Sequence, residues 1–264
     1  MSSLAWIILF TAIGGAASAI AASLFLIAPA KLRARALPHL VSFATGALLG
    51  AALLGLLPDA IQSVGLAGAH RIGLTLLSGV LIFFVLEKLL LWRHCHQEVC
   101  EGHVPQDDHA HAKNRDAASA SLVLIGDSFH NVLDGVLIAA AFLTDIHLGV
   151  VTSMAVVAHE IPQEVGDFAV LLNGGMSRSR ALTLNLLTSL TSVIGGVVAY
   201  FFLAQTRALL PYALALAASS FLYIAVADLI PGLHRRVDPG SGIRQIVLIS
   251  VGVAVIYFSH SMAH

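Results

Sequence analysis

HNVLDG at residues 130–135 and HEIPQEVGD at residues 159–167 are two polar clusters, each set in an otherwise apolar segment. No lysine or arginine occurs between Arg115 and Arg178, so the carboxylates of both clusters have no basic partner nearby in the sequence. A carboxylate inside a membrane is costly, and it normally faces a cavity or an ion path. The two clusters therefore predict a membrane protein whose interior binds a cation.

The composition agrees with this prediction. The chain has 264 residues, of which 58% are hydrophobic and only 11% are charged. Soluble domains contain about a quarter charged residues, so we interpret residues 1–264 as a single polytopic domain in a lipid bilayer. A formal net charge of −1 argues against a nucleic-acid partner.

Apolar segments long enough to cross a membrane recur along the whole chain. A transmembrane helix needs roughly 20 apolar residues. By this rule the sequence predicts an all-α integral membrane protein with a bundle of eight transmembrane helices. The predicted helices are residues 4–29, 38–62, 70–92, 119–143, 147–173, 179–205, 208–232 and 243–261.

The basic residues predict the orientation of this bundle. Twelve of the 14 lysines and arginines fall on one side of the predicted membrane, which leaves Arg71 and Arg207 on the other. Cytoplasmic loops carry the excess of basic residues. We therefore expect both termini outside and the polar stretch 93–118 in the cytosol.

That polar stretch is rich in histidine and cysteine. Its candidate metal-binding side chains are His94, Cys95, His96, Cys100, His103, His109 and His111. Their spacing matches no closed four-ligand structural site, so we interpret the stretch as a cytosolic metal buffer or sensor. A charged linker that contains histidine by chance is the alternative.

Helical spacing groups the polar residues of the two clusters. Residues three and four positions apart share one face of a helix, as His130 and Asp134 do in one cluster and His159 and Gln163 in the other. If the two helices face each other, the four can surround one ion. A second ion would have Asn131, Asp134 and Glu160, with Gln163 as a further candidate. Such mixed ligands suit first-row divalent ions, and the absence of thiolate argues against Cu(I).

Helix-breaking residues accompany both clusters. Pro162 cannot donate a helical hydrogen bond, and Gly135 and Gly166 lower the helix propensity beside the polar residues. We therefore expect both helices to be kinked or broken there, as is common at the binding sites of transporters. A hydrogen-bonded polar network without metal is the alternative interpretation.

These motifs resemble the signatures of the ZIP (Zrt/Irt-like) family of divalent metal transporters, nearest its LIV-1-type branch. HNVLDG resembles the fourth-helix signature of that family, and HEIPQEVGDF resembles the fifth. The likeness extends to FFVLEKLLLWRHCH at residues 83–96 and ASSFLYIAVADLIPGLH at residues 218–234. It implies eight helices with both termini outside, a His-rich cytosolic loop, and a two-metal centre between the fourth and fifth helices. It also implies an elevator-like movement of a transport bundle and a homodimer.

The sequence departs from the family pattern at three places. Gln163 stands where relatives have histidine or glutamate, and Gly55 stands where the second helix usually carries histidine. The sixth helix lacks the carboxylate of some members and offers only Asn185, Thr188 and Ser189. The second metal position is therefore the weaker of the two.

We predict a transporter that imports a divalent cation, zinc first among them, across the inner or plasma membrane. The cation is substrate, no cofactor is expected, and the protein is not an enzyme. Asp127, Glu164 and Asp167 would lie on the exit side. Two rivals remain. One is an intramembrane zinc metallohydrolase, since HEIPQ resembles HExxH with glutamine for the second histidine. The other is a metal-selective channel.

Overall fold

The structure is a computed structural model that describes residues 2–95, 109–173, 175–234 and 239–261. Every regular element among these residues is helical, which confirms the predicted all-α class. The long helices are α1 (Ser3–Ile27), α2 (Ala30–Gly50), α4 (Ala69–Cys95), α5 (His109–Thr144), α6 (Ile146–Asn173), α7 (Arg178–Ser189), α8 (Thr191–Gln205), α9 (Leu210–Tyr223) and α11 (Pro239–Ser261). The short elements are η1 (Ala51–Leu56), α3 (Leu57–Val64), η2 (Leu66–Gly68), η3 (Arg207–Leu209), η4 (Ile224–Leu229) and α10 (Ile230–His234).

Each predicted transmembrane segment corresponds to one helical segment of the structure. In the described part of the chain, seven segments are long and apolar enough to cross a membrane. α6 is the eighth, and its polar side chains at residues 159–167 lower its hydropathy. A membrane helix can carry these side chains when they face protein instead of lipid, and α6 is surrounded by α1, α2, α5, α7 and α11. The protein is therefore built as a bundle of transmembrane helices.

Two helices begin eight or more residues earlier than predicted. α2 starts at Ala30 rather than at residue 38, and α5 starts at His109 rather than at residue 119. Alanine, leucine, arginine and lysine are strong helix formers, and they dominate both added segments. The predicted polar loop 93–118 is therefore helical at both of its ends, which corrects its boundaries.

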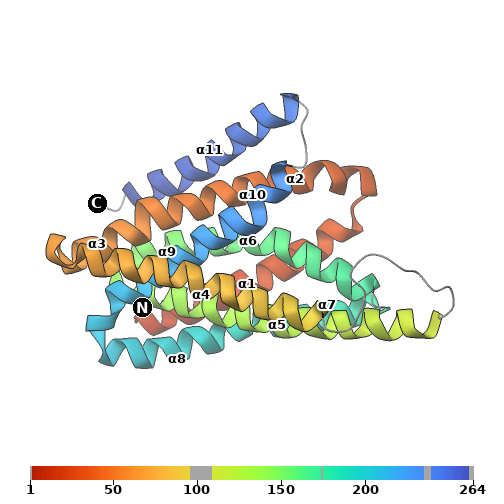
Figure 1. Cartoon of the computed structure of the whole chain (residues 1–264), viewed down its shortest axis with the longest axis horizontal. Helices are drawn as coiled ribbons and strands as arrows, with labels where there is room; N and C mark the ends of the chain where they lie inside the picture. The colour runs from red at the N-terminus through yellow and green to blue at the C-terminus, as the bar shows by residue number, and fades with distance from the viewer. Residues whose placement is uncertain (1, 96–108, 174, 235–238, 262–264) are drawn as a thin grey trace.

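The two ends of the described chain lie at the same end of the bundle. The start of α1 and the end of α11 lie together, whereas α4 ends and α5 begins at the opposite end (Figure 1). An even number of crossings produces this arrangement. Which end faces the cytosol stays a prediction from the basic residues.

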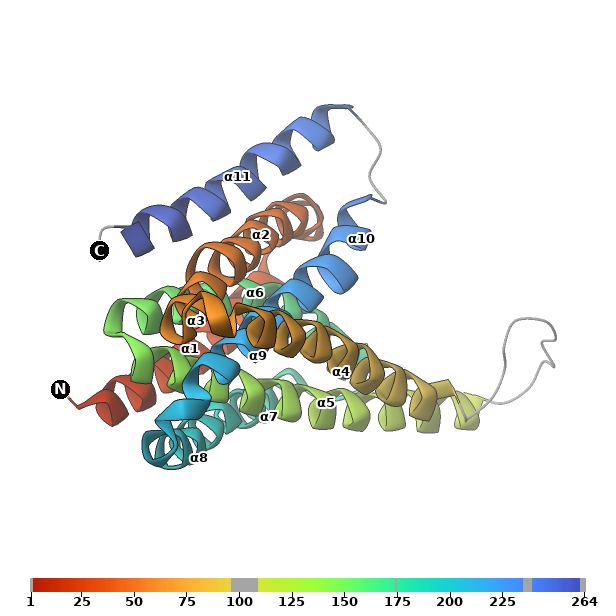
Figure 2. The ribbon, with the colours of Figure 1, turned by 60° about the vertical axis from the view of Figure 1, so that its left-hand side comes forward.

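Two pairs of helices pack most extensively, and α6 contacts a member of each pair. α5 packs most extensively on α8, and α11 packs on α2, as Figure 2 shows. A side chain at Gly135 of α5 would collide with the backbone oxygen of Ser192, and one at Gly195 of α8 would collide with the backbone oxygen of Val132. Glycine thus lets α5 and α8 meet backbone to backbone, as small residues do between membrane helices. This contact fixes α5 at the first polar cluster itself.

The predicted breaks at the two polar clusters do not occur. α6 continues from Ile146 to Asn173 with Pro162 inside it, and α5 continues through Gly135. Membrane helices tolerate proline because neighbouring groups can satisfy the freed carbonyl. The expectation that these helices break is therefore wrong, and the expected kink at Pro162 stays a prediction.

The interruptions lie in other spans. η1 and η4 are six-residue π-helical turns, and each ends two residues before a proline, Pro58 or Pro231. A proline has no N–H, so the preceding turn shifts to the longer i→i+5 hydrogen bond. The predicted sixth helix is likewise divided at Leu190 into α7 and α8. Pro58 and Pro231 were the sequence signs of the two π-helical turns, and neither turn was predicted.

Candidate metal centre

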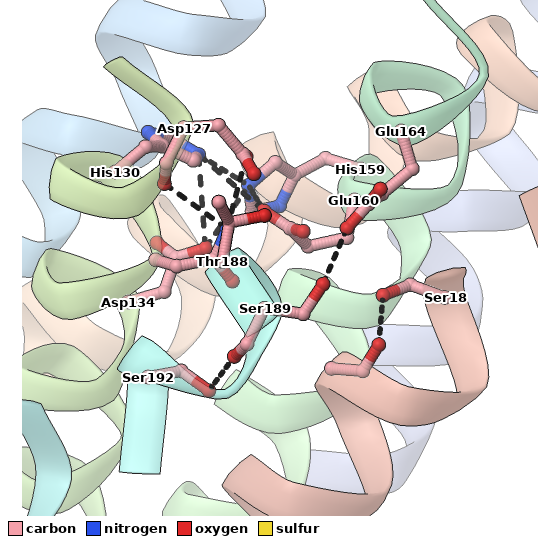
Figure 3. Close-up of polar contacts among 12 residues, drawn as sticks. Ser18, Asp127, His130, Asp134, His159, Glu160, Glu164, Thr188, Ser189 and Ser192 are labelled. Carbon is pink, nitrogen blue, oxygen red and sulfur yellow. Dashed lines mark hydrogen bonds and ion pairs between the residues drawn. The ribbon is translucent and has the colours of Figure 1, made fainter. Parts of the chain in front are cut away.

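The candidate metal centre lies between α5 and α6, where four side chains converge (Figure 3). α5 supplies His130 and Asp134, and α6 supplies His159 and Glu160. One nitrogen or oxygen atom from each lies within 4.8 Å of all the others. The i, i+4 spacing on α5 puts its pair on one face, and the adjacent pair on α6 meets that face. The structure thus brings together three of the four side chains predicted for the first ion, and with them Glu160, which was predicted for the second.

The distances within this cluster match the dimensions of one four-coordinate ion. The Nε2 atoms of His130 and His159 are 3.2 Å apart. Oδ2 of Asp134 lies 3.4 Å from Nε2 of His159 and 3.7 Å from Nε2 of His130. Oε1 of Glu160 lies 3.6 and 3.8 Å from Nε2 of His130 and His159, respectively. With bonds of about 2.0–2.2 Å, the corners of a tetrahedral zinc site lie roughly 3.3–3.6 Å apart.

His159 is oriented by its own helix. Its Nδ1 lies 3.1 Å from the backbone oxygen of Ala155. A carbonyl oxygen can only accept, so Nδ1 carries the hydrogen and Nε2 is left with a lone pair toward the cluster. Histidines that bind metals are commonly held in this way, with the second nitrogen donating to a carbonyl or carboxylate. The ring of Phe221 on α9 packs against His159 at 6.0 Å between centroids and limits its movement.

The carboxylates of the cluster are buried without hydrogen-bond donors. Asp134 and Glu160 are 1% and 2% exposed, and none of their four oxygen atoms accepts a hydrogen bond from any described residue. Within the described part of the chain, the basic side chains within 4.0 Å of them are the two histidines, which carry a charge only when protonated. A buried, unpaired carboxylate is strongly unfavourable. A bound cation would remove this cost for both side chains at once.

A pocket borders the two carboxylates without reaching either histidine. It lies among α1, α5, α6 and α8. Its polar lining is formed by Thr11, Asn131, Asp134, Ser153, Glu160 and Ser192. Three of these, Asn131, Asp134 and Glu160, are the group that the sequence assigned to a second ion. Asn131, Asp134 and Glu160 therefore line one pocket. The polar side chains that line it from α6 and α8 are Ser153, Glu160 and Ser192, and all three offer oxygen atoms.

Gln163 does not line the pocket. It is half-buried on α6, one turn after His159. The described residues around it form no hydrogen bond with its side chain. Its assignment as a metal ligand stays a prediction.

The three residues predicted on the exit side lie close to the cluster. Asp127 is buried on α5, one turn before Asn131, and the Nδ2 atom of Asn131 donates to its Oδ1 at 3.0 Å. Glu164 is buried on α6, and Asp167 is half-buried one turn later. Their place on the cytosolic side depends on the predicted orientation.

Glu164 has partners that the sequence analysis did not assign to it. Asn185 and Ser189 of α7 donate to its two carboxylate oxygens, the latter at 2.6 Å. Asn185, Ser189 and Ser192 are polar at i, i+4 and i+7 in an apolar segment, and all three are buried. That spacing was visible in the sequence as one polar face. Only the packing of α7 on α6 shows which carboxylate it serves.

The candidate ligands of the polar stretch fall at or beyond the limits of the described residues. His96, Cys100 and His103 lie outside them. His94 and Cys95 end α4, and His109 and His111 begin α5. Their role as a cytosolic metal buffer or sensor stays a prediction.

Comparison with protein families now adds an independent observation. The family described as "ZIP Zinc transporter" matches residues 93–260, which is well over half of the chain. The chain belongs to the ZIP family. The match contains α5, α6 and α7, and therefore both polar clusters and the four converging side chains.

Individual relatives of the chain are also described as zinc transporters. The chain is 28% identical to zinc transporter zipt-7.1 of Caenorhabditis briggsae, over 96% of this chain and 78% of that protein. It is 31% identical to human zinc transporter ZIP13, over 83% of this chain and 69% of that protein. It is 39% identical to zinc transporter foi of Drosophila melanogaster, over 53% of this chain and 20% of that protein. ZIP13 and foi belong to the LIV-1 subfamily, which confirms the resemblance seen in the sequence.

Family membership and fold together define the class of this protein. It is a multi-pass membrane protein of a family of zinc transporters, and the metal ion is a transported substrate. The relatives named above are transporters rather than enzymes.

Proposed function

We propose that this protein carries zinc or a related divalent cation into the cytosol through a site between α5 and α6. His130, Asp134, His159 and Glu160 would hold the first ion. The observation that carries the proposal is the convergence of these side chains, with two carboxylates whose oxygens have no donor among the described residues. Imidazole nitrogen and carboxylate oxygen together suit zinc.

The remaining site residues extend this proposal. Asn131 would complete the second position in the pocket, and Gln163 would be a neutral ligand within reach of it. Asp127, Glu164 and Asp167 would lie on the cytosolic side of the centre, toward the exit. This direction follows from placing both termini outside, as the basic residues favour. We also propose the inner or plasma membrane and a homodimer, as the family resemblance implies.

The test is uptake of zinc by proteoliposomes containing the purified full-length protein. His159→Ala should abolish zinc-dependent flux, because it removes one of the two imidazoles that contact both carboxylates of the cluster, and the one that is fully buried. The matched control is His147→Ala, which removes an exposed histidine near the start of the same helix. It should leave flux unchanged.

Three results would decide the matter. Near-normal transport by the His159→Ala protein would overturn the site between α5 and α6. Flux that does not saturate with zinc concentration would favour the channel over the carrier. Uptake seen only from the side of the α4–α5 connection would reverse the proposed direction.

A further inference from the structure

Asn131 uses both hydrogens of its amide on one neighbour. Its Nδ2 atom lies 3.1 Å from the backbone oxygen of Asp127 and 3.0 Å from Oδ1 of the same residue. A side-chain amide has two N–H donors on nitrogen and an acceptor oxygen at the other end. Because both acceptors belong to Asp127, the nitrogen end of Asn131 is fixed toward that residue. The oxygen end must then point away from it.

The pocket is the space beside Asn131 that this oxygen can face. Asn131 lines the pocket together with Asp134 and Glu160, whereas Asp127 does not line it. Asn131 is itself 2% exposed, so its amide has no solvent to satisfy it. If the amide turned over, its oxygen would meet two oxygens of Asp127 at about hydrogen-bond distance with no proton between them. Such a contact is unfavourable in a buried site.

We propose that Asp127 is a positioning residue that holds the nitrogen of Asn131 and so presents its Oδ1 atom to a cation in the pocket. The inference rests on the proposed function, since it concerns how the second position of that site is built. It gives Asp127 a task that depends on an acceptor oxygen at one place. A carboxylate that only attracts cations along an exit path would depend on its negative charge instead.

The chemistry of the pocket indicates which ion should report this effect. Asn131, Asp134 and Glu160 offer oxygen only, while the two histidines offer nitrogen. Oxygen ligands suit Mn²⁺, and imidazole suits Zn²⁺. Loss of the oriented amide should therefore weaken Mn²⁺ binding more than Zn²⁺ binding. A general loss of structure would weaken both alike.

The experiment is calorimetric titration of the purified full-length protein with Mn²⁺ and, separately, Zn²⁺. Asp127→Ala should lower the Mn²⁺ affinity by about 10-fold, the lower end of the usual effect of removing a group that orients a metal ligand. Asp127→Asn should retain most of the affinity, because its amide oxygen can still accept from Asn131. The control is Ser128→Ala, whose hydroxyl donates to the backbone of Leu124 on the same helix.

A double-mutant cycle separates positioning from a direct role. In an Asn131→Ala protein, the further change Asp127→Ala should have no added effect on Mn²⁺ affinity, because the amide to be held is gone. Asn131→Ala alone should lower that affinity at least as much as Asp127→Ala does. This arm still applies if the Asp127→Ala protein does not fold.

Several outcomes would overturn the inference. Equal losses in Asp127→Asn and Asp127→Ala would show that charge, not orientation, is what Asp127 provides. Additive losses of affinity in the double variant would show that Asp127 acts independently of Asn131. Native Mn²⁺ affinity in the Asn131→Ala protein would show that Asn131 is not a ligand. If the native protein binds metal and His159→Ala does not, the proposed function survives these failures. A native protein that binds neither metal would overturn the proposed function itself.

Discussion

Glu160 and Glu164 lie one turn apart on α6 and are both buried, but their carboxylate oxygens have opposite surroundings. Neither oxygen of Glu160 accepts a hydrogen bond from a described residue, whereas both oxygens of Glu164 accept from α7. A buried carboxylate with donors is far less costly than a bare one. The comparison indicates that Glu160 needs a cation, while Glu164 joins α6 to α7.

The neighbouring helix creates this difference. Glu160 meets the imidazole of His130 at 3.6 Å, so its surroundings on α5 consist of other potential ligands. Glu164 meets an amide and a hydroxyl, and the single hydrogen of the Ser189 hydroxyl is shared between Glu164 and the backbone oxygen of Asn185. Two glutamates of one helix thus differ in role because α5 presents potential metal ligands to Glu160, and α7 presents hydrogen-bond donors to Glu164.

The largest expected effect separates the two glutamates directly. Glu160→Gln should lower zinc affinity by more than about 100-fold, the upper end of what changing an outer group costs, because it removes a charged ligand. Glu164→Gln should change zinc affinity far less, since its oxygens are engaged with α7. Calorimetry on the two purified variants measures both, and each variant is the other's control. Equal losses would show that both glutamates bind the ion.

A smaller effect should appear in stability. Asn185→Ala removes one of the donors to Glu164 and leaves a buried carboxylate oxygen without a partner, which typically costs about 1–3 kcal/mol. The free energy of unfolding in detergent should fall by that amount, with little change in zinc affinity per folded molecule. The control is Ser18→Ala, because among the described residues the acceptor of the buried Ser18 hydroxyl is the backbone oxygen of Gly15, in the same helix. Lost zinc affinity with unchanged stability would place Asn185 in the metal site.

The helices and the central cluster were predictable because both follow from local rules. Runs of apolar residues have to match the thickness of a bilayer, and i, i+4 spacing puts His130 and Asp134 on one face whatever the rest of the chain does. The absence of basic residues around them indicated a cation. The cluster therefore required only that α5 and α6 be neighbours, which their short connection ensures.

What the sequence did not reveal depends on contacts between distant segments. Glu164 was grouped with the exit-side carboxylates by charge alone, because nothing local indicates that Asn185 and Ser189 pack against it. Pro162 was expected to break α6, yet the interruptions precede Pro58 and Pro231. The surroundings of a proline decide whether its helix continues, and those surroundings are tertiary.

The smallest expected effect concerns Gln163, which lies between the two glutamates and one turn after His159. Asp134 and Glu160 together can neutralise one divalent ion but not two, so we expect the native protein to bind one zinc well and a second weakly. Gln163→His should tighten zinc binding and slow release, because imidazole is a stronger zinc ligand than a neutral amide.

Gln163→Glu should instead raise occupancy of the second position, since a third carboxylate offsets more of the charge of a second ion. Anomalous scattering or calorimetric stoichiometry on the native protein and both variants measures this. The half-buried position of Gln163, outside the pocket lining, means that either new side chain must reach inward along α6. Two equally tight ions in all three proteins would show that Gln163 is not a metal ligand. Glu160 would then bind the metal without help from the residue at position 163.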